Sequence, residues 1–133
     1  MGLRIEPPPQ ITEFNHIWRR WIYGLYQSLK EQEEWLAPAL ENGWVNFGAP
    51  FSSAGYMLDS MGFVHLRGVI RTGTFAAAAF TLPAGYQPES DKVFSTSSNN
   101  SFGSLTVTLA GAVVPQVGSD TSFSLDGIIF KTA

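Results

Sequence analysis

The chain has 133 residues, a formal net charge of −3 and no cysteine, so its length fits one ordinary domain or a small domain with an appendage. Such a small charge argues against nucleic acid and anionic membranes as partners, and the lack of cysteine excludes disulfides and thiolate metal sites. Hydrophobic residues make up 44% and aromatic residues 14%, which is enough for a packed core and argues against disorder throughout.

The first ten residues contain a proline run, Pro7, Pro8 and Pro9. Consecutive prolines favour an extended polyproline II conformation and offer no backbone donors to a sheet. We therefore predict an extended arm over residues 1–10. Two interpretations stay open: the prolines dock into a groove on a larger partner, or the arm is simply exposed.

Residues 11–37 are predicted to form a helical stem that ends before Pro38, because a proline disfavours the α conformation in the residue before it. Apolar or amide residues recur in alternating steps of four and three, the spacing of a coiled-coil seam. The seam consists of Ile11, Asn15, Trp18, Ile22, Leu25, Leu29, Gln32 and Leu36. Its two amides fix register and strand number at some cost in stability. We expect a trimeric coiled coil; the alternatives are packing on the chain's own domain and docking to another protein.

Residues 42–133 carry signals for strands separated by turn residues at intervals of about ten. The expected strands span 44–47, 56–59, 63–71, 74–82, 92–97, 102–109, 112–116 and 121–131. We expect a hairpin between the second and third of these, and a bulge or turn at Asp126-Gly127 that splits the last. This spacing predicts a mainly β fold, an antiparallel β-sandwich of jelly-roll-like type. So few charges follow Arg67 that the domain is expected to bury surface against copies of itself.

Residues that could perform chemistry are sparse. The two histidines, His16 and His65, are far apart and have no carboxylate at metal-ligand spacing. The carboxylates of the second half lie in or beside predicted turns, where aspartate is common for local hydrogen bonding, and no G-x-S-x-G motif is present. We therefore predict that the chain is not an enzyme and needs no metal and no cofactor.

Two groups of residues are candidates for structural or binding roles. Arg67 lies on a mostly apolar predicted strand and needs a carboxylate or carbonyl partner, for which we expect Asp59 or Asp126 of the same or a neighbouring chain. Sugar sites combine aromatic faces with nearby amides and hydroxyls. The candidates for glycan contact are Tyr56, Tyr86, Asn99, Asn100 and Phe102. The alternative is that Tyr86 is a core or interface residue and that the asparagines form a plain hairpin turn.

Two motifs carry a resemblance to a known family. Gly62 to Gly68 reads G-F-V-H-L-R-G, and Leu82 to Pro88 reads L-P-A-G-Y-Q-P. The region from Gly43 to Ala133 resembles the C-terminal tip domain of bacteriophage tail-fibre and virion-spike proteins, whose members commonly have arginine where Gln87 stands. The resemblance implies a homotrimeric β structure on the surface of a phage particle.

Together these observations predict a short phage virion fibre or spike. Three chains would join through the stem, the arm would attach them to other virion proteins, and the β tip over residues 42–133 would contact a host-surface glycan. The alternative is a tail or collar adaptor, or a head-decoration protein, without receptor binding. Neither nucleic acid nor a membrane is expected as a partner.

Overall fold

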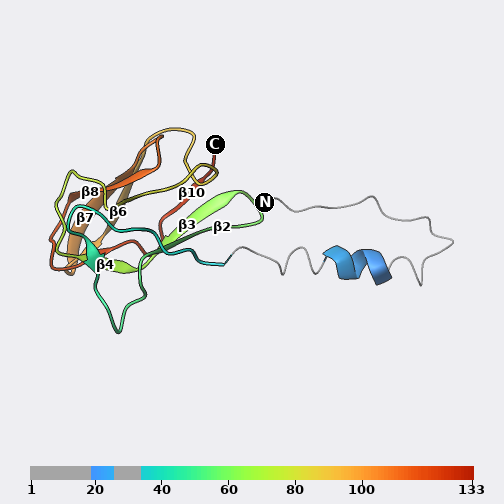
Figure 1. The fold of residues 1–133 in the computed structure, drawn as a ribbon, viewed down its shortest axis with the longest axis horizontal. Coiled ribbons are helices and arrows are strands. Elements are labelled where there is room, and N and C mark those ends of the chain that lie inside the picture. Colours follow the sequence, from blue (N-terminus) through green and yellow to red (C-terminus); the bar gives the residue numbers. More distant parts are fainter. Residues whose placement is uncertain (1–18, 26–33) are drawn as a thin grey trace.

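The computed structural model describes residues 19–25 and 34–133 (Figure 1). Residues 19–25 are helical, which agrees with the predicted stem over that stretch. No described helix is long and apolar enough to cross a membrane. Of the predicted seam, Ile22 lies in this helix and is 55% exposed, and Leu25 is half-buried. The proline arm and the seam positions Ile11, Asn15, Trp18, Leu29 and Gln32 lie outside the described residues.

The described residues after 34 form short strands and the turns between them. The strands are β1 (Val45–Asn46), β2 (Gly55–Leu58), β3 (Phe63–Arg67), β4 (Val69–Arg71), β5 (Phe80–Thr81), β6 (Lys92–Ser98), β7 (Ser101–Val107), β8 (Ala112–Val117), β9 (Phe123–Ser124) and β10 (Ile129–Lys131). They make three antiparallel sheets in the orders β1-β4-β9, β10-β3-β2 and β5-β8-β7-β6. The prediction of a mainly β, antiparallel fold is confirmed, whereas the jelly-roll-like type and the trimeric coiled coil stay predictions.

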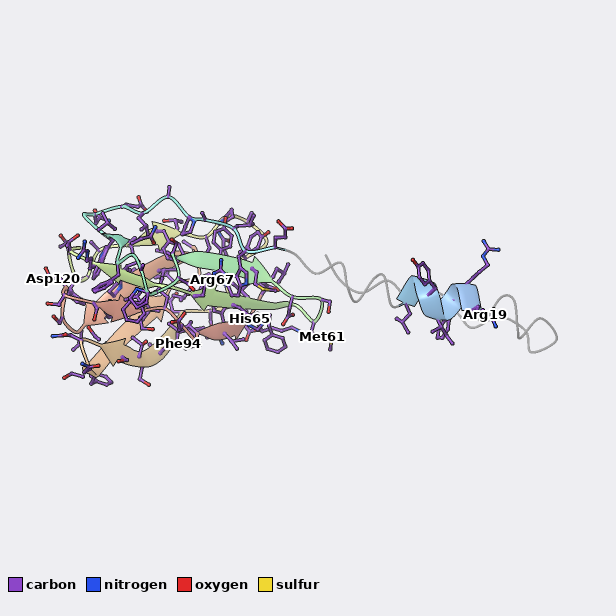
Figure 2. The ribbon with its side chains drawn as sticks, turned by 90° about the horizontal axis from the view of Figure 1, so that it is seen from below. Arg19, Met61, His65, Arg67, Phe94 and Asp120 are labelled. Carbon is purple, nitrogen blue, oxygen red and sulfur yellow. The ribbon has the colours of Figure 1, made fainter. Side chains whose placement is uncertain are left out.

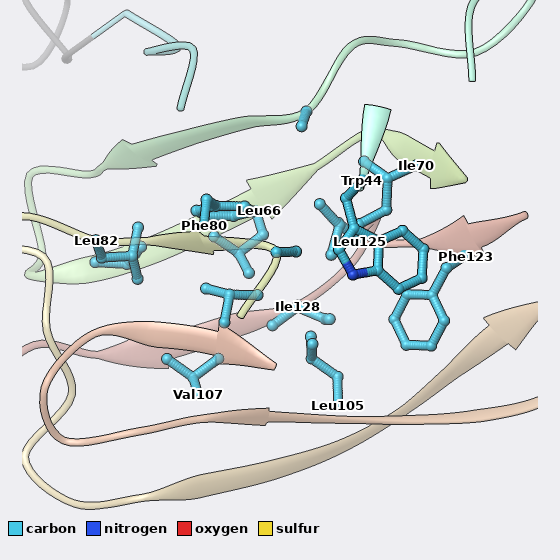
Figure 3. Packing of buried hydrophobic residues seen from close by; sticks show 14 of the residues in the cluster. Trp44, Leu66, Ile70, Phe80, Leu82, Leu105, Val107, Phe123, Leu125 and Ile128 are labelled. Carbon is cyan, nitrogen blue, oxygen red and sulfur yellow. The ribbon is translucent and has the colours of Figure 1, made fainter. Parts of the chain in front are cut away.

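One continuous core joins the three sheets (Figure 3). The four-stranded sheet contributes Phe80, Leu105 and Val107, and the two smaller sheets contribute Leu66 and Ile70 from the other side. The longer strands β3, β6, β7 and β8 alternate more and less buried residues over most of their length, since successive side chains of a strand point to opposite faces. In β7, for example, Leu105 and Val107 are buried while the residues next to them, Ser104 and Thr106, are more exposed.

The strand predicted over 63–71 is two strands in two sheets. Gly68 divides them, with a φ of 105° that side-chain-bearing residues rarely adopt. The break changes which side chains are buried: Val64 and Leu66 face the core before it, but both Val69 and Ile70 are buried after it. Val69 is therefore buried, whereas one unbroken strand over 63–71 would turn it to the same face as Phe63, His65 and Arg67.

The predicted strand over 74–82 is also wrong for most of its length, because only Phe80–Thr81 is a strand. Ala76 has a φ of 60°, and the segment forms turns. Its backbone is nevertheless bonded to strand β8: the Ala76 N–H donates to Pro115 O (2.8 Å) and the Ala79 N–H to Val113 O (2.7 Å). Small side chains let this irregular segment lie close to the sheet edge.

The predicted stem is wrong at its C-terminal end, because residues 34–36 are not helical. Leu36 forms an antiparallel bridge with Tyr56 of β2. The Leu36 N–H donates to Tyr56 O (2.8 Å), and the Tyr56 N–H donates to Leu36 O (3.0 Å). The edge of β2 thus satisfies both the N–H and the C=O of Leu36. These two hydrogen bonds outweigh a continued helix, which Pro38 would end within two residues. The hairpin of β2 and β3 and the division at Asp126-Gly127 are as predicted.

Candidate functional site

The hairpin of β6 and β7 ends in a two-residue turn at Asn99 and Asn100. Their φ values are 48° and 61°, the left-handed pair that matches the twist of a tight hairpin, and asparagine tolerates it well. Both side chains are exposed, as is Phe102, which is 64% exposed two residues later. Three of the five predicted glycan contacts therefore lie together at one end of the four-stranded sheet.

Ser98 holds this turn in place, although no pattern in the sequence distinguishes it from the neighbouring serines. It is 1% exposed, and its hydroxyl donates to Ser122 O (2.8 Å), lies 3.0 Å from Ser119 O and accepts from the Ser119 N–H (2.8 Å). The Asn99 N–H donates to the Ser122 hydroxyl (3.1 Å). The turn at Asn99 and the loop at 118–122 are thus bonded into one unit.

Two further turns, at residues 42–43 and 72–76, are hydrogen-bonded to each other and to the loop at 118–122. The Thr72 N–H donates to Asp120 O (2.8 Å), and the Thr72 hydroxyl donates to Gly43 O (3.0 Å). Thr72 has a φ of 67°, which is costly for a β-branched residue and persists only where its surroundings enforce it. Figure 2 shows Asp120 at one end of the β region and Met61 at the other.

Three aromatic rings lie beneath these turns. Trp44 packs edge-on against Phe75 and Phe123, with ring centroids 5.4 and 5.9 Å apart. Its indole N–H donates to Thr74 O (3.1 Å). A Cβ at Gly73 would lie only 1.9 Å from the Trp44 ring, so the backbone touches the indole directly. The end formed by the turns at 42–43, 72–76, 99–100 and 118–122, which we call the turn platform, therefore rests on a packed base.

The other two glycan candidates, Tyr56 and Tyr86, lie together but elsewhere. Their rings meet edge to face with centroids 5.0 Å apart, and both are half-buried against the core. Next to Tyr86, the Gln87 amide donates to Ala110 O (3.0 Å), beside the turn that joins β7 to β8. Since Asn99 lies at the opposite end of β7, the five candidates form two separate groups.

Arg67 does not pair with Asp59 or Asp126 within the described part of the chain. Its guanidinium instead stacks over the Trp35 ring, 4.5 Å from the centroid, and its Nε is buried without a hydrogen-bond partner there. Asp126 accepts a hydrogen bond from the Gly68 N–H (2.8 Å). Pairing of Arg67 with a carboxylate of a neighbouring chain stays a prediction. The sequence does not reveal the stack, because the seam spacing places Trp35 in the helix.

Asp59 is paired with His65 instead. Its Oδ2 lies 2.8 Å from His65 Nε2, and its Oδ1 accepts from the N–H groups of Met61 (2.9 Å) and Phe63 (3.0 Å). Burial alone would raise the pKa of Asp59, but the hydrogen bonds from His65 and the two N–H groups outweigh it and lower that pKa below 3.8. In the sequence, an aspartate at the start of a hairpin turn is the signal that its side chain accepts hydrogen bonds from backbone N–H groups of that turn.

The described residues contain no group of three or more histidine, aspartate or glutamate side chains able to hold a metal ion. At the turn platform they present hydrogen-bonded turns with exposed amides and hydroxyls, and the exposed ring of Phe102 lies beside it on β7. Such a surface suits recognition by hydrogen bonds and ring stacking.

No protein-family model and no curated protein matches the chain. The structure is similar to the crystal structure of the receptor binding protein (gp15) of Listeria phage PSA, with a TM-score of 0.63. The similarity covers 86% of this chain and 74% of that chain, at 20% sequence identity. At that identity the comparison shows a shared fold.

Proposed function

We propose that this chain is a structural and adhesive protein of a phage virion. It acts as a short homotrimeric spike, attached through its N-terminal arm, that presents its β region to a host-surface glycan. The observation that carries the proposal is the fold, which is shared with a phage receptor binding protein over 86% of this chain. The motifs at Gly62–Gly68 and Leu82–Pro88 support the same assignment from the sequence.

The turn platform is the surface that we assign to the host. Asn99 and Asn100 present amides on a turn whose conformation is fixed by Ser98 below it. A rigid site loses little conformational entropy on binding, which favours even weak ligands such as sugars. Tyr56 and Tyr86 are half-buried against the core, so they are the weaker candidates for direct contact.

Three copies would turn weak single sites into firm attachment. When identical sites share one stem, the second and third contacts form at a high effective concentration, and the combined affinity exceeds that of one site by orders of magnitude. The seam of the predicted stem supports such an assembly, and residues 19–25 are helical as it requires. No catalytic step enters this mechanism.

Binding of the labelled full-length chain to a panel of whole bacterial cells and purified surface polysaccharides tests the proposal. Asn100→Gly removes the amide while keeping a residue that accepts a φ of 61°. Since a hydrogen bond contributes about 1 kcal/mol, we expect this variant to bind roughly five- to tenfold more weakly per site. Met61→Ser, at the opposite end of the β region, is the matched control and should bind normally.

Three results would contradict the proposal in different ways. If the intact chain binds no cell and no polysaccharide, it is an adaptor or a head-decoration protein. If Met61→Ser lowers binding and Asn100→Gly does not, the turn platform is the wrong surface. If the chain cleaves or deacetylates a polysaccharide, it is an enzyme.

A further inference from the structure

The outer face of the four-stranded sheet is unusual among the described surfaces, because its strands place no charged side chain on it. The pairing register defines the face: Val93 lies opposite Thr106, which lies opposite Val114, and Ser95 lies opposite Ser104, which lies opposite Val117. A third row pairs Ser97 with Phe102. Two carboxylates lie at the rim of the sheet: Asp91 precedes β6 and accepts from the Leu109 N–H (2.7 Å), and Glu41 accepts from the Thr81 hydroxyl (3.2 Å).

Three large apolar side chains of this face are exposed. Val93 is 75% exposed, Phe102 64% and Val117 53%. The other side chains of these rows are serines and threonines, which add hydroxyls without charge, and the half-buried Val114. Around them, β6 is the edge strand of its sheet, and none of its outward residues is a lysine or a proline.

An exposed apolar sheet face next to an edge strand whose one charged residue, Lys92, lies at its first position is a site of association. Proteins that remain monomeric usually protect such edges with charges, prolines or bulges. Strand β6 runs in unbroken register with β7 over seven residue pairs. The face is therefore one that a partner covers.

The outer faces of the other two sheets differ in charge. On the β10-β3-β2 sheet, His65 is paired with Asp59 at 2.8 Å and Lys131 lies over Phe63 at 5.2 Å. On the β1-β4-β9 sheet, Arg71 lies over Phe47 at 5.2 Å. Burying these groups between copies would cost desolvation energy, since charged groups leave water only with compensation.

We propose that the outer face of the four-stranded sheet is where copies of this chain meet. This inference rests on the proposed trimer and names the surface that each chain contributes to it. Because the chain has a net charge of −3, identical copies repel one another least where the contact contains no charge. Cores of protein interfaces are likewise depleted of charged residues and enriched in aromatic ones; this face has no charge and includes the ring of Phe102.

The size of the face indicates that it acts together with the stem. The four strands have 2, 7, 7 and 6 residues; at about 3.4 Å per residue and about 4.8 Å between strands they give a footprint of roughly 360 Å². A stable interface commonly takes about 800 Å² from each partner. The face thus supplies about half, and the predicted helical seam supplies the other contact. Phe102, a glycan candidate from the sequence, belongs to this interface instead.

Single cysteines test the inference cleanly, because the chain has none of its own. Ser95→Cys and Ser104→Cys each place one thiol on the face, and Ile129→Cys places one on the β10-β3-β2 sheet, where Ile129 is 46% exposed. Each full-length variant is treated with a short bis-maleimide and separated by denaturing electrophoresis. Sedimentation of the untreated protein gives its assembly state. We expect a trimer in which the two serine variants cross-link between chains and the isoleucine variant does not.

The outcomes separate this inference from the proposed assembly. If the protein is a trimer and only Ile129→Cys cross-links, the face is wrong while the trimer stands. If the protein sediments as a monomer and no variant cross-links, both are wrong. As a second measurement, Val93→Lys should shift the sedimenting population toward monomer by at least about tenfold, whereas Met61→Lys, a similarly exposed site (67%), should not. Equal effects of the two lysines would overturn the inference.

Discussion

Gly68, the residue between β3 and β4, is predicted to be among the least replaceable glycines of the β region. Two separate costs meet there. Its φ is 105°, which an alanine adopts at a cost of about 1–2 kcal/mol. A Cβ would also lie 2.6 Å from Ala54 N and Ser53 O and 2.7 Å from Ala54 Cα. All three are backbone atoms, so the clash cannot be relieved by turning a side chain, and overpacking of this kind costs about 1–3 kcal/mol.

Gly68→Ala should therefore lower the free energy of unfolding by about 2–5 kcal/mol, a large part of the roughly 5–15 kcal/mol typical of a domain. Relief by a backbone shift would weaken two hydrogen bonds, from the Gly68 N–H to Asp126 Oδ1 (2.8 Å) and from the Leu125 N–H to Gly68 O (2.7 Å). Urea unfolding followed by circular dichroism, with all proteins at the same concentration because assembly shifts the midpoint, measures the loss.

Gly85→Ala is the matched control. Gly85 has a φ of 94°, and a Cβ added there would meet no atom within 4 Å, so alanine carries the conformational cost without the clash. We expect it to lose about 1–2 kcal/mol. If Gly68→Ala is no less stable than Gly85→Ala, the close approach of the Ala54 backbone is wrong and so is the reasoning that the break between β3 and β4 requires glycine.

Three further predictions concern single contacts. Because the pKa of Asp59 is lowered in the folded state, the stability that this carboxylate contributes is present above its unfolded pKa of about 3.9 and is lost as pH falls through the lower folded value. Asp59→Asn should therefore flatten the acid side of a stability–pH curve measured by urea midpoints. An unchanged curve would contradict the hydrogen bonds of Asp59 to His65 and to the Met61 and Phe63 N–H groups. Ser98→Ala should cost about 1–3 kcal/mol because it removes a buried hydroxyl and leaves part-buried backbone groups of the platform without that partner. Ser97→Ala, at an exposed residue, should be near neutral in the same assay. Trp35→Ala removes the stack on the guanidinium and should speed hydrogen exchange at the Tyr56 amide, which donates to Leu36 O; equal exchange rates would show that the stack does not hold the bridge.

Strand positions are predictable where alternation and turn chemistry agree. The hairpin of β6 and β7 is the best example, since Asn99 and Asn100 are residues that a tight turn requires and the flanking strands alternate regularly. The break at Gly68 is not predictable in the same way. The run from Phe63 to Arg71 reads as one continuous strand, and a glycine inside a strand does not reveal whether its φ is positive.

The errors at Leu36 and at the alanine run have one physical cause. Both segments carry a convincing local pattern, a coiled-coil step in one case and strand flanks in the other, but tertiary backbone bonds decide their structure. Leu36 is bonded to the edge of β2 and Ala79 to β8. A local pattern contains no information about an open edge elsewhere in the chain.

The candidate site is predictable in part for a related reason. Asn99, Asn100 and Phe102 stand out in the sequence because they are surface types in or beside a turn, and the structure places them together. The pairing of Asp59 with His65 depends on the register of β2 and β3, which puts Asp59 beside the hairpin turn. Charge alone suggests that Asp59 pairs with Arg67, but charge says nothing about register.

The link between the predicted stem and the β region follows from these same contacts. Since Leu36 bonds to Tyr56 and Trp35 stacks on Arg67, the chain is already fixed to β2 and β3 before residue 37. Gly55 makes room for this, because a Cβ there would lie 3.2 Å from Arg67 Nε and 3.5 Å from Leu36 O. A coiled-coil seam must therefore end before Leu36, which leaves the other predicted positions for association. Each hydrogen bond between Leu36 and Tyr56 contributes about 1 kcal/mol. A mechanical force applied to the chain before residue 35 would therefore act first on β2 and β3, through these bonds and the stack of Trp35 on Arg67.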